Sequence, residues 1–220
     1  MNNSKLAIFD FDGTVADSLE WSFSVLSEVA RQYGFREITI EQREMLRGRP
    51  NREIIAYLGI PVWKLPVIAR GVRKIAARDI GQIRTFPWVQ DIFSSLRSRD
   101  IAIAIVSSNS EANIRRVLGA DVASMVQQYA ADAALFGKAA KIKAVIKKCA
   151  SSIESTTSIG DEVRDVEAAR AIGISSLAVT WGYATASALE AAGPTRLVHQ
   201  ATELLDWFEM WAPEPKHALR

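Results

Sequence analysis

Two acidic residues near the start of the chain have the type and spacing of a metal-binding pair. Asp10 and Asp12 follow the apolar run Leu6 to Phe9, and side chains at alternate positions of an extended strand leave on the same side. Gly13 allows the backbone to turn directly afterwards. Converging carboxylates repel each other unless a cation bridges them, and Mg²⁺ prefers such oxygen ligands. The pattern indicates a divalent-cation site, although two aspartates that only cap a strand-to-loop turn would give the same pattern.

Small polar residues follow a second apolar run, at Ser107, Ser108 and Asn109. Their hydroxyl, amide and backbone N–H groups could hold a phosphoryl oxygen, as helix N-termini do. The alternative is that Ser108, Asn109 or Ser110 serves only as the N-cap of the next helix. Taken alone, this segment does not decide between the two.

A lysine lies at an unfavourable place in the segment Phe136 to Lys138. Lys138 follows Gly137 at the expected start of a helix, where the helix dipole disfavours a cation. Neutralising the charge of phosphate and carboxylates is one candidate reason for a lysine at this position. The other lysines of this basic stretch are interpreted as a solvated helix face: Lys141, Lys143, Lys147 and Lys148.

A third apolar run ends in Gly160 and Asp161, with Glu162 next and Asp165 four residues after Asp161. Residues with this spacing lie on one face of a helix. Acids in a first helical turn are stabilising without any metal, which accounts for Glu162 and Asp165. It accounts less well for Asp161, which we regard as a candidate metal ligand.

Alternating strands and helices predict an α/β fold, a parallel sheet with helices on both faces. In such sheets, ligands bind at the carboxyl ends of the strands, where all four polar segments fall. The predicted strands are Leu6 to Phe9, Ile101 to Val106, Thr157 to Ile159, Leu177 to Thr180 and, more weakly, Val126 to Ala130. The predicted helices are Val89 to Arg99, Glu111 to Leu118, Ala139 to Lys148 and Val163 to Ala171, the last ended by Gly173.

About ninety residues separate the first predicted strand from the second, far more than one crossover needs. This interval has helical patterns and no convincing strand. We interpret residues 17–84 as a helical insertion, or cap, and residues 1–16 with 85–220 as the core, with Pro87 near the return. The insertion has 12 Lys and Arg against 8 Asp and Glu, which would favour an anionic ligand beneath it.

The composition indicates an ordinary soluble globular protein, with 49% hydrophobic and 24% charged residues. With 27 basic and 25 acidic residues, the chain does not suggest a partner among nucleic acids or membranes. No apolar stretch approaches the length of a membrane span or signal segment, so we expect a cytoplasmic protein. Cys149 cannot form an internal disulfide and is expected to be a small hydrophobe near a helix end. Six tryptophans, Trp207 and Trp211 among them, could lie in the core or an interface, so monomer and homodimer both stay open.

The chain resembles the haloacid dehalogenase superfamily over nearly its whole length. The resemblance rests on four motifs in this order: Asp-x-Asp-Gly-Thr, a strand-end Ser, a Lys and Gly-Asp-x-x-x-Asp. The nearest likeness is the phosphoglycolate phosphatase and β-phosphoglucomutase branch, which has a Rossmann-like core and a helical cap. The resemblance implies that Asp10 attacks phosphorus to form an aspartyl-phosphate, while Asp12 is the general acid and base. It assigns Mg²⁺ to the Asp10 carboxylate, the Asp12 backbone carbonyl and Asp161, with Asp165 binding through water or from an outer position.

The same resemblance gives the remaining core residues their roles. Ser107 or Ser108 would hold the phosphoryl group; we prefer Ser107, the first polar residue after the apolar run. Thr14 would support the loop beside the phosphate, and Lys138 would offset charge on the intermediate. Dehalogenases and phosphonoacetaldehyde hydrolases lack an acid matching Asp12, so this residue favours phosphate ester chemistry.

The segment Leu46 to Glu53 resembles the part of β-phosphoglucomutase-like caps that meets the substrate. By that match Gly48 and Arg52 are candidate specificity residues, with Arg47 and Arg49 as neighbours. A solvated basic turn is an equally good account of this segment.

The expected activity is Mg²⁺-dependent hydrolysis of a small phosphoester, such as a phosphoglycolate-like molecule or a sugar monophosphate. One alternative is phosphotransfer of the phosphoglucomutase type, which the same four segments would serve. Another is a binding protein on this fold that has lost catalysis. Such a protein would be expected to lack Asp10, Asp12 or Lys138, and all are present.

Overall fold

The protein, described here from a computed structural model, is built around one parallel sheet. The structure describes residues 5–131 and 137–210. Six strands are in the order β5-β4-β1-β6-β7-β8, and every neighbouring pair is parallel. They are β1 (Leu6–Phe9), β4 (Ala102–Val106), β5 (Gln128–Ala130), β6 (Thr156–Gly160), β7 (Ser175–Val179) and β8 (Arg196–Val198).

Helices connect the strands and fill the long interval after β1. They are α1 (Leu19–Tyr33), α2 (Ile40–Leu46), α3 (Asn51–Leu58), α4 (Leu65–Arg78), α5 (Val89–Ser98), α6 (Glu111–Met125), α7 (Lys138–Lys148), α8 (Val163–Ile172), α9 (Ala186–Ala192) and α10 (Thr202–Met210), with short 3₁₀ turns at Val62–Lys64 and Ile80–Gln82. Within the described ranges, no single helix has the length and apolar character of a membrane span, although the bent pair Asn51–Leu58 and Val62–Arg78 meets both criteria together.

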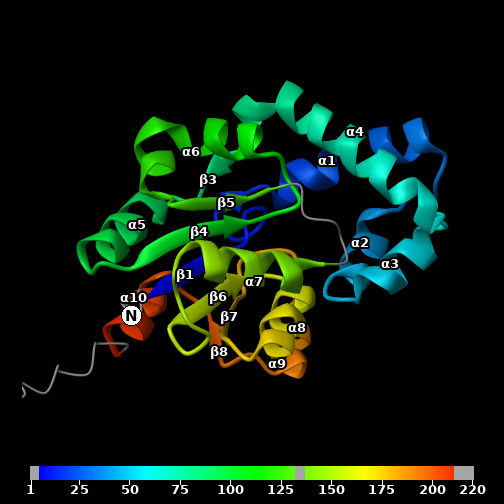
Figure 1. The fold of residues 1–220 in the computed structure, drawn as a ribbon. Coiled ribbons are helices and arrows are strands. Elements are labelled where there is room, and N and C mark those ends of the chain that lie inside the picture. Colours follow the sequence, from blue (N-terminus) through cyan, green and yellow to red (C-terminus); the bar gives the residue numbers. More distant parts are fainter. Residues whose placement is uncertain (1–4, 132–136, 211–220) are drawn as a thin grey trace, which may run out of the picture.

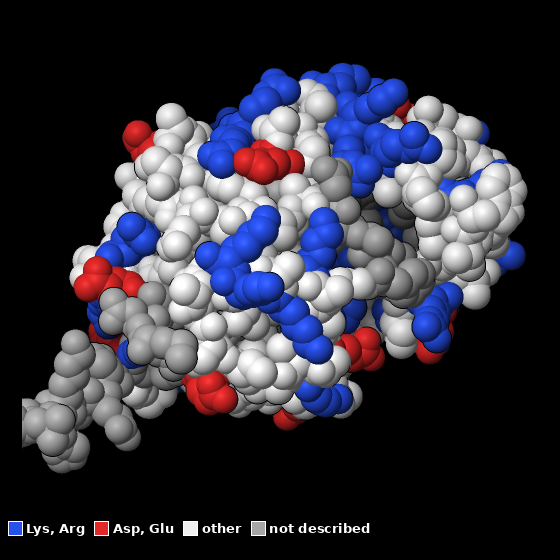
Figure 2. All heavy atoms as spheres, in the orientation of Figure 1, with Lys and Arg blue, Asp and Glu red and all other residues white. Residues whose placement is uncertain are grey.

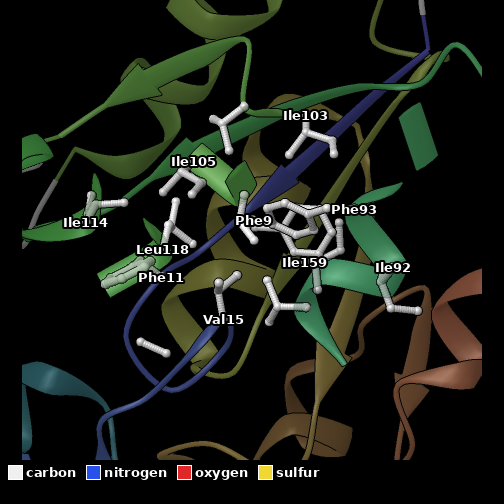
Figure 3. Packing of buried hydrophobic residues seen from close by; sticks show 14 of the residues in the cluster. Phe9, Phe11, Val15, Ile92, Phe93, Ile103, Ile105, Ile114, Leu118 and Ile159 are labelled. Carbon is white, nitrogen blue, oxygen red and sulfur yellow. The ribbon is translucent and has the colours of Figure 1, made fainter. Parts of the chain in front are cut away.

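The sheet has a hydrophobic core on each face, because strand side chains alternate between the faces. Ala7 and Phe9 of β1 belong to the cluster under α5, α6 and α10, whereas Leu6 and Ile8 belong to the cluster under α7 and α8. Figure 3 shows the first cluster, in which the rings of Phe9 and Phe93 lie 5.0 Å apart. The predicted α/β fold with helices on both faces is confirmed.

All five predicted strands are present, with ends that shift by two residues or fewer. The sequence-based prediction missed the edge strand β8, which has only three residues. It also missed β2 (Ala16–Asp17) and β3 (Arg84–Thr85), an antiparallel pair in the interval that we expected to be free of strands. These strands are too short to give a periodic pattern, so their pairing depends on the tertiary fold.

The helix predicted from Glu111 to Leu118 extends to Met125, which corrects its C-terminal end. Gly119 has a positive φ of 72° and breaks the helix, but helical structure resumes after it. Ser110 is the N-cap, and its Oγ accepts a hydrogen bond from the Asn113 backbone N–H. The capping alternative is therefore correct for Ser110.

The inserted segment lies at one end of the sheet. Figure 1 shows α1 to α4 grouped beyond the carboxyl end of β1, while α5 to α10 surround the sheet. The pair β2 and β3 joins the two ends of this segment, with Asp17 opposite Arg84 and Ala16 opposite Thr85. This arrangement holds the insertion above the strand ends that carry the polar segments.

The α7 lysines behave largely as expected. Lys143, Lys147 and Lys148 are exposed, and Figure 2 shows Lys and Arg side chains gathered over α7 and over α4. Lys141 is half-buried and donates to the Ala131 carbonyl.

Two predictions about apolar residues can be checked at the ends of helices. Cys149 is buried directly after α7, as expected of a small hydrophobe. Trp207 packs against the core, and its indole N–H donates to Thr157 Oγ1. Trp211 and Phe136 lie outside the described residues.

Candidate active site

Asp10 lies at the carboxyl end of β1 and is almost completely buried, with 3% of its surface exposed. Its backbone N–H donates to the Ile159 carbonyl, which fixes the position of the residue beside β6. Asp10 Oδ1 is 2.9 Å from Lys138 Nζ, but Oδ2 is buried without a hydrogen-bond partner among the described residues. Burial raises the pKa of Asp10, and Lys138 opposes that rise. One oxygen of this carboxylate is therefore left for a ligand.

Lys138 is the first residue of α7, and its ammonium group lies between two acids. Nζ is 2.9 Å from Asp10 Oδ1 and 2.6 Å from Asp165 Oδ1. Burial would lower the pKa of Lys138, but the two carboxylates outweigh burial and hold that pKa above its ordinary value. The unfavourable helix position noted in the sequence is thus explained by acids contributed from other segments.

The acids after β6 are held in different ways. Asp161 is fully buried; Oδ1 accepts from the Thr14 hydroxyl at 2.6 Å and Oδ2 from the Tyr183 N–H at 2.7 Å. Asp165 Oδ2 accepts from the Glu162 N–H in a capping box that begins α8. Asp165 lies in the first turn of α8, where an acid was expected to stabilise the helix, and its other oxygen binds Lys138.

A metal ion fits the group formed by Asp10, Asp161 and Asp165. One oxygen from each carboxylate lies within 4.8 Å of the others, and one oxygen of Asp10 is buried without a partner in the described chain. Burial and the neighbouring acids raise the pKa of Asp161 well above its ordinary value. A cation would relieve the repulsion between these buried acids, and hard oxygen ligands suit Mg²⁺. The side chain of Asp12 is not part of this three-acid group.

Replacing the buried lysine tests the charge balance of this group. Lys138→Met is expected to lower the free energy of unfolding by about 3–5 kcal/mol without metal, because two buried carboxylates lose their partner. Chemical denaturation with and without Mg²⁺ measures the change, and added Mg²⁺ should recover part of it. Lys143→Met, an exposed change on the same helix, is the control and should alter stability by less than about 0.5 kcal/mol. Equal stability of the two variants would contradict the ion pairs.

Asp12 is half-buried beside Asp10 and is bonded differently. Both of its carboxylate oxygens lie near the Asn109 side-chain amide, at 3.3 and 3.4 Å. Burial, together with repulsion from Asp10, raises the pKa of Asp12 to about 7. An acid with this pKa can both give and take a proton near neutral pH. The two aspartates of the first motif therefore lie in distinct environments.

The two serines after β4 lie in different surroundings. Ser107 is buried, and its Oγ accepts from the Asn109 backbone N–H at 3.0 Å, close to the amide that meets Asp12. Ser108 is half-buried and lines a cavity beside the inserted helices, and its carbonyl accepts from Arg73. Ser107 is thus linked to Asp12 through Asn109. Which of the two hydroxyls binds a phosphoryl group stays a prediction.

A cavity of about 300 Å³ lies between the inserted helices and the strand ends. Gly48 borders it with a φ of +78°, and a Cβ there would come within 2.6 Å of Ala188 Cβ. Glycine at this position lets the loop after α2 approach α9 closely. Arg47 fastens the same loop, because its guanidinium donates to the carbonyls of Gly182 and Tyr183 at 3.1 Å each.

The other two candidate arginines of this loop occupy different positions. Arg49 pairs with Glu53 at 3.2 Å and borders both this cavity and a second one of about 500 Å³. Arg52 borders only the second cavity, which also reaches Lys138. The structure therefore brings Gly48 and Arg49, but not Arg52, to the cavity that Ser108 lines.

Two residues near the acids were not recognised from the sequence as part of a site: Arg164 and Tyr183. Asn109 was considered either as a phosphoryl-binding residue or as a helix cap, but its contact with Asp12 was not predicted. Tyr183 follows β7 by four residues, so the rule that ligands bind at the carboxyl ends of strands could have found it. Arg164 lies inside the motif between Asp161 and Asp165, and the helix-dipole argument that singled out Lys138 could have found it, because it is the second residue of a helix.

Comparisons with known proteins agree with this arrangement. The family model described as haloacid dehalogenase-like hydrolase matches residues 7–179. The chain is 31% identical over 199 residues to a phosphoglycolate phosphatase of Synechococcus elongatus, which covers 90% of this chain and 94% of that protein. It is 24% identical over 202 residues to tyrosine-protein kinase PtkA of Mycobacterium tuberculosis, covering 90% of this chain and 69% of that protein.

A solved structure supports the fold. A haloacid dehalogenase-like family hydrolase from Streptococcus pneumoniae superposes with a TM-score of 0.76 at 21% identity. The superposition covers 94% of this chain and all of the other. The sheet and the inserted helices are therefore shared at the level of architecture.

Proposed function

Because the chain belongs to the haloacid dehalogenase-like hydrolase family and is a phosphoric monoester hydrolase of it, we propose a Mg²⁺-dependent phosphatase that acts on a small phosphorylated metabolite. The substrate is phosphoglycolate or a related phosphoester, or a sugar monophosphate. The observation that carries the proposal is the buried Asp10 carboxylate, with one oxygen on Lys138 and the other without a partner among the described residues.

In the first step, an Asp10 oxygen attacks phosphorus and the bond from phosphorus to the leaving oxygen breaks. Asp12 gives its proton to that oxygen, so the product leaves as an alcohol. The pKa of about 7 supports this role, because a substantial fraction of Asp12 is protonated near neutral pH. Lys138 stays beside Asp10 and offsets negative charge as the aspartyl-phosphate forms.

In the second step, the ionised Asp12 takes a proton from water, and the water oxygen attacks phosphorus. The bond between phosphorus and Asp10 breaks, which releases phosphate and restores both carboxyl groups. The Asn109 amide, 3.3 Å from Asp12, orients the carboxylate through both steps. Ser107, held beside Asn109, would bind a phosphoryl oxygen.

Mg²⁺ would be held by the carboxylates of Asp10 and Asp161, with Asp165 directly or through water. The likeness to the family adds the backbone carbonyl of Asp12. When bound, the ion supplies positive charge to the phosphoryl oxygens. Thr14 and the Tyr183 N–H keep the Asp161 carboxylate in place, which gives Thr14 a supporting role in the loop.

We also propose that residues 17–84 form a cap over a core made of residues 1–16 and 85–220. The β2 and β3 pair at both ends of the segment supports this division. The cavity bordered by Gly48, Arg49 and Ser108 supports a substrate site between cap and core.

A panel of phosphometabolites with the purified chain tests the proposal. Phosphate release is expected with Mg²⁺, and EDTA should lower the rate at least about a hundredfold until Mg²⁺ is restored. Interconversion of sugar phosphate isomers without net phosphate release would favour a mutase instead. No phosphate release from any member with Mg²⁺ would contradict the phosphatase.

A further inference from the structure

In the described ranges, two buried side-chain atoms have no hydrogen-bond partner, and both belong to the candidate site. One is Asp10 Oδ2, which the proposed reaction uses. The other is Nε of Arg164. Buried polar groups in folded proteins almost always have a partner, so an unpaired N–H on a residue that borders a cavity favours a ligand acceptor at that residue. Arg164 borders both cavities under the cap.

The orientation of Arg164 leaves Nε without an acceptor among the described residues. It is the second residue of α8, where the helix dipole disfavours a cation, so helix stability does not explain it. Its terminal nitrogen Nη2 is bound to Glu162, whose carboxylate also caps α8. This ion pair fixes the plane of the guanidinium, and the Nε edge is left to donate elsewhere.

The other arginines of the smaller cavity have their guanidinium groups occupied in other ways. Arg43 stacks over the Phe23 ring at 4.3 Å, Arg47 donates to two backbone carbonyls, and Arg49 pairs with Glu53. Arg164 differs from these three because its Nε is buried and has no hydrogen-bond partner in the described chain.

Basic side chains outnumber acidic ones in the lining of the smaller cavity. Arg43, Arg47, Arg49 and Arg164 line it, and the acid that lines it is Glu162. Its remaining walls include apolar side chains of the cap, among them Phe23, Leu26 and Ile54. Lys138, which would offset the charge of the transferred phosphoryl group, does not line this cavity. A second anionic group of the substrate would therefore meet an arginine here and not Lys138.

We propose that Arg164 binds a carboxylate of the substrate, a group separate from the transferred phosphoryl group. The proposal rests on the phosphatase function and adds a specificity residue on the core side of the cavity. A carboxylate suits the site because its oxygens accept the in-plane N–H groups of a guanidinium whose orientation is already fixed. Arg164 therefore selects phosphoesters that carry a carboxylate within a few bonds of phosphorus.

Matched substrate pairs measure this selection. Phosphoglycolate is compared with ethylene glycol monophosphate, and phosphoglycerate with glycerol phosphate; the second member of each pair lacks the carboxylate. The native chain is expected to favour the carboxylate member of at least one pair in kcat/KM. Arg164→Gln should lower that preference about 10- to 100-fold, the range for loss of a charged hydrogen bond, mainly through KM. Arg164→Lys should lose less.

Arg170→Gln is the control, because Arg170 lies on the same helix and donates to the exposed carbonyls of Ala192 and Gly193. It should leave the preference unchanged. If Arg164→Gln lowers kcat/KM equally for both members of each pair, the proposal is overturned. An equal loss would indicate that Arg164 binds the phosphoryl group or exerts a general charge effect. A native chain without preference for either carboxylate member would also overturn it.

A binding measurement separates this proposal from the phosphatase function. In an Asp10→Asn background, which prevents turnover, calorimetry should detect tighter binding of the carboxylate member of a pair. Adding Arg164→Gln should remove the difference. If the difference in affinity between the two members disappears with Arg164→Gln, the arginine assignment is supported even when the phosphoester turns over slowly. If the difference in affinity persists, the assignment is overturned even in an active phosphatase.

Discussion

Asp10→Asn is expected to lower phosphate release at least about ten thousandfold while the protein stays folded. The amide cannot act as a nucleophile toward phosphorus, and no other described carboxylate has a buried oxygen without a partner. Because burial already disfavours the charged form of Asp10, the neutral amide should not lower the midpoint of thermal unfolding without Mg²⁺. Phosphate release and circular dichroism measure the two effects.

Asp17→Asn is the matched control, since Asp17 is exposed in β2 and undergoes the same chemical change. Its activity should remain within about twofold of the native chain. A folded Asp10→Asn variant that keeps a tenth or more of the native activity would contradict the assignment of the nucleophile.

Asp161→Asn is expected to weaken Mg²⁺ binding at least about a hundredfold. This loss of affinity is larger than that expected when a residue beyond the direct ligands is replaced. An amide at this position keeps one oxygen but loses the charge, and its NH₂ group would face either the Thr14 hydroxyl or the Tyr183 N–H. Activity measured against Mg²⁺ concentration should show a lower rate that rises again at high Mg²⁺. Calorimetric titration with Mg²⁺ gives the affinity directly.

Asp206→Asn, an exposed change on α10 away from the strand ends, is the control for this experiment. It should leave the Mg²⁺ dependence unchanged. Native Mg²⁺ affinity in Asp161→Asn would show that the ion, if bound, does not use this carboxylate.

The sequence was sufficient to predict the centre of the sheet and the order of the polar segments. β1 was predicted to the residue, because its four residues are apolar and buried on both faces. α8 was predicted to within one residue, because Gly173 ends it in a left-handed conformation with φ of 86°. Lys138 could be recognised as anomalous from helix electrostatics alone.

What the sequence did not predict depends on contacts between distant segments. Asn109 meets Asp12 across 97 positions of the chain, and Tyr183 meets Asp161 across 22. Arg164 pairs with the nearby Glu162, but the sequence does not indicate that its Nε is buried without a hydrogen-bond partner in the described chain. No periodic pattern records such contacts, so they emerged only with the structure.

The central claim is that Asp10 carries the phosphoryl group, and trapping the intermediate tests it most directly. Borohydride reduces an acyl phosphate of aspartate to homoserine, so enzyme quenched with borohydride during turnover can be digested and examined by mass spectrometry. We predict homoserine at position 10, only with substrate and Mg²⁺ present, and not in Asp10→Asn. Reduction at another acid, or steady turnover without any reduced residue, would contradict the account.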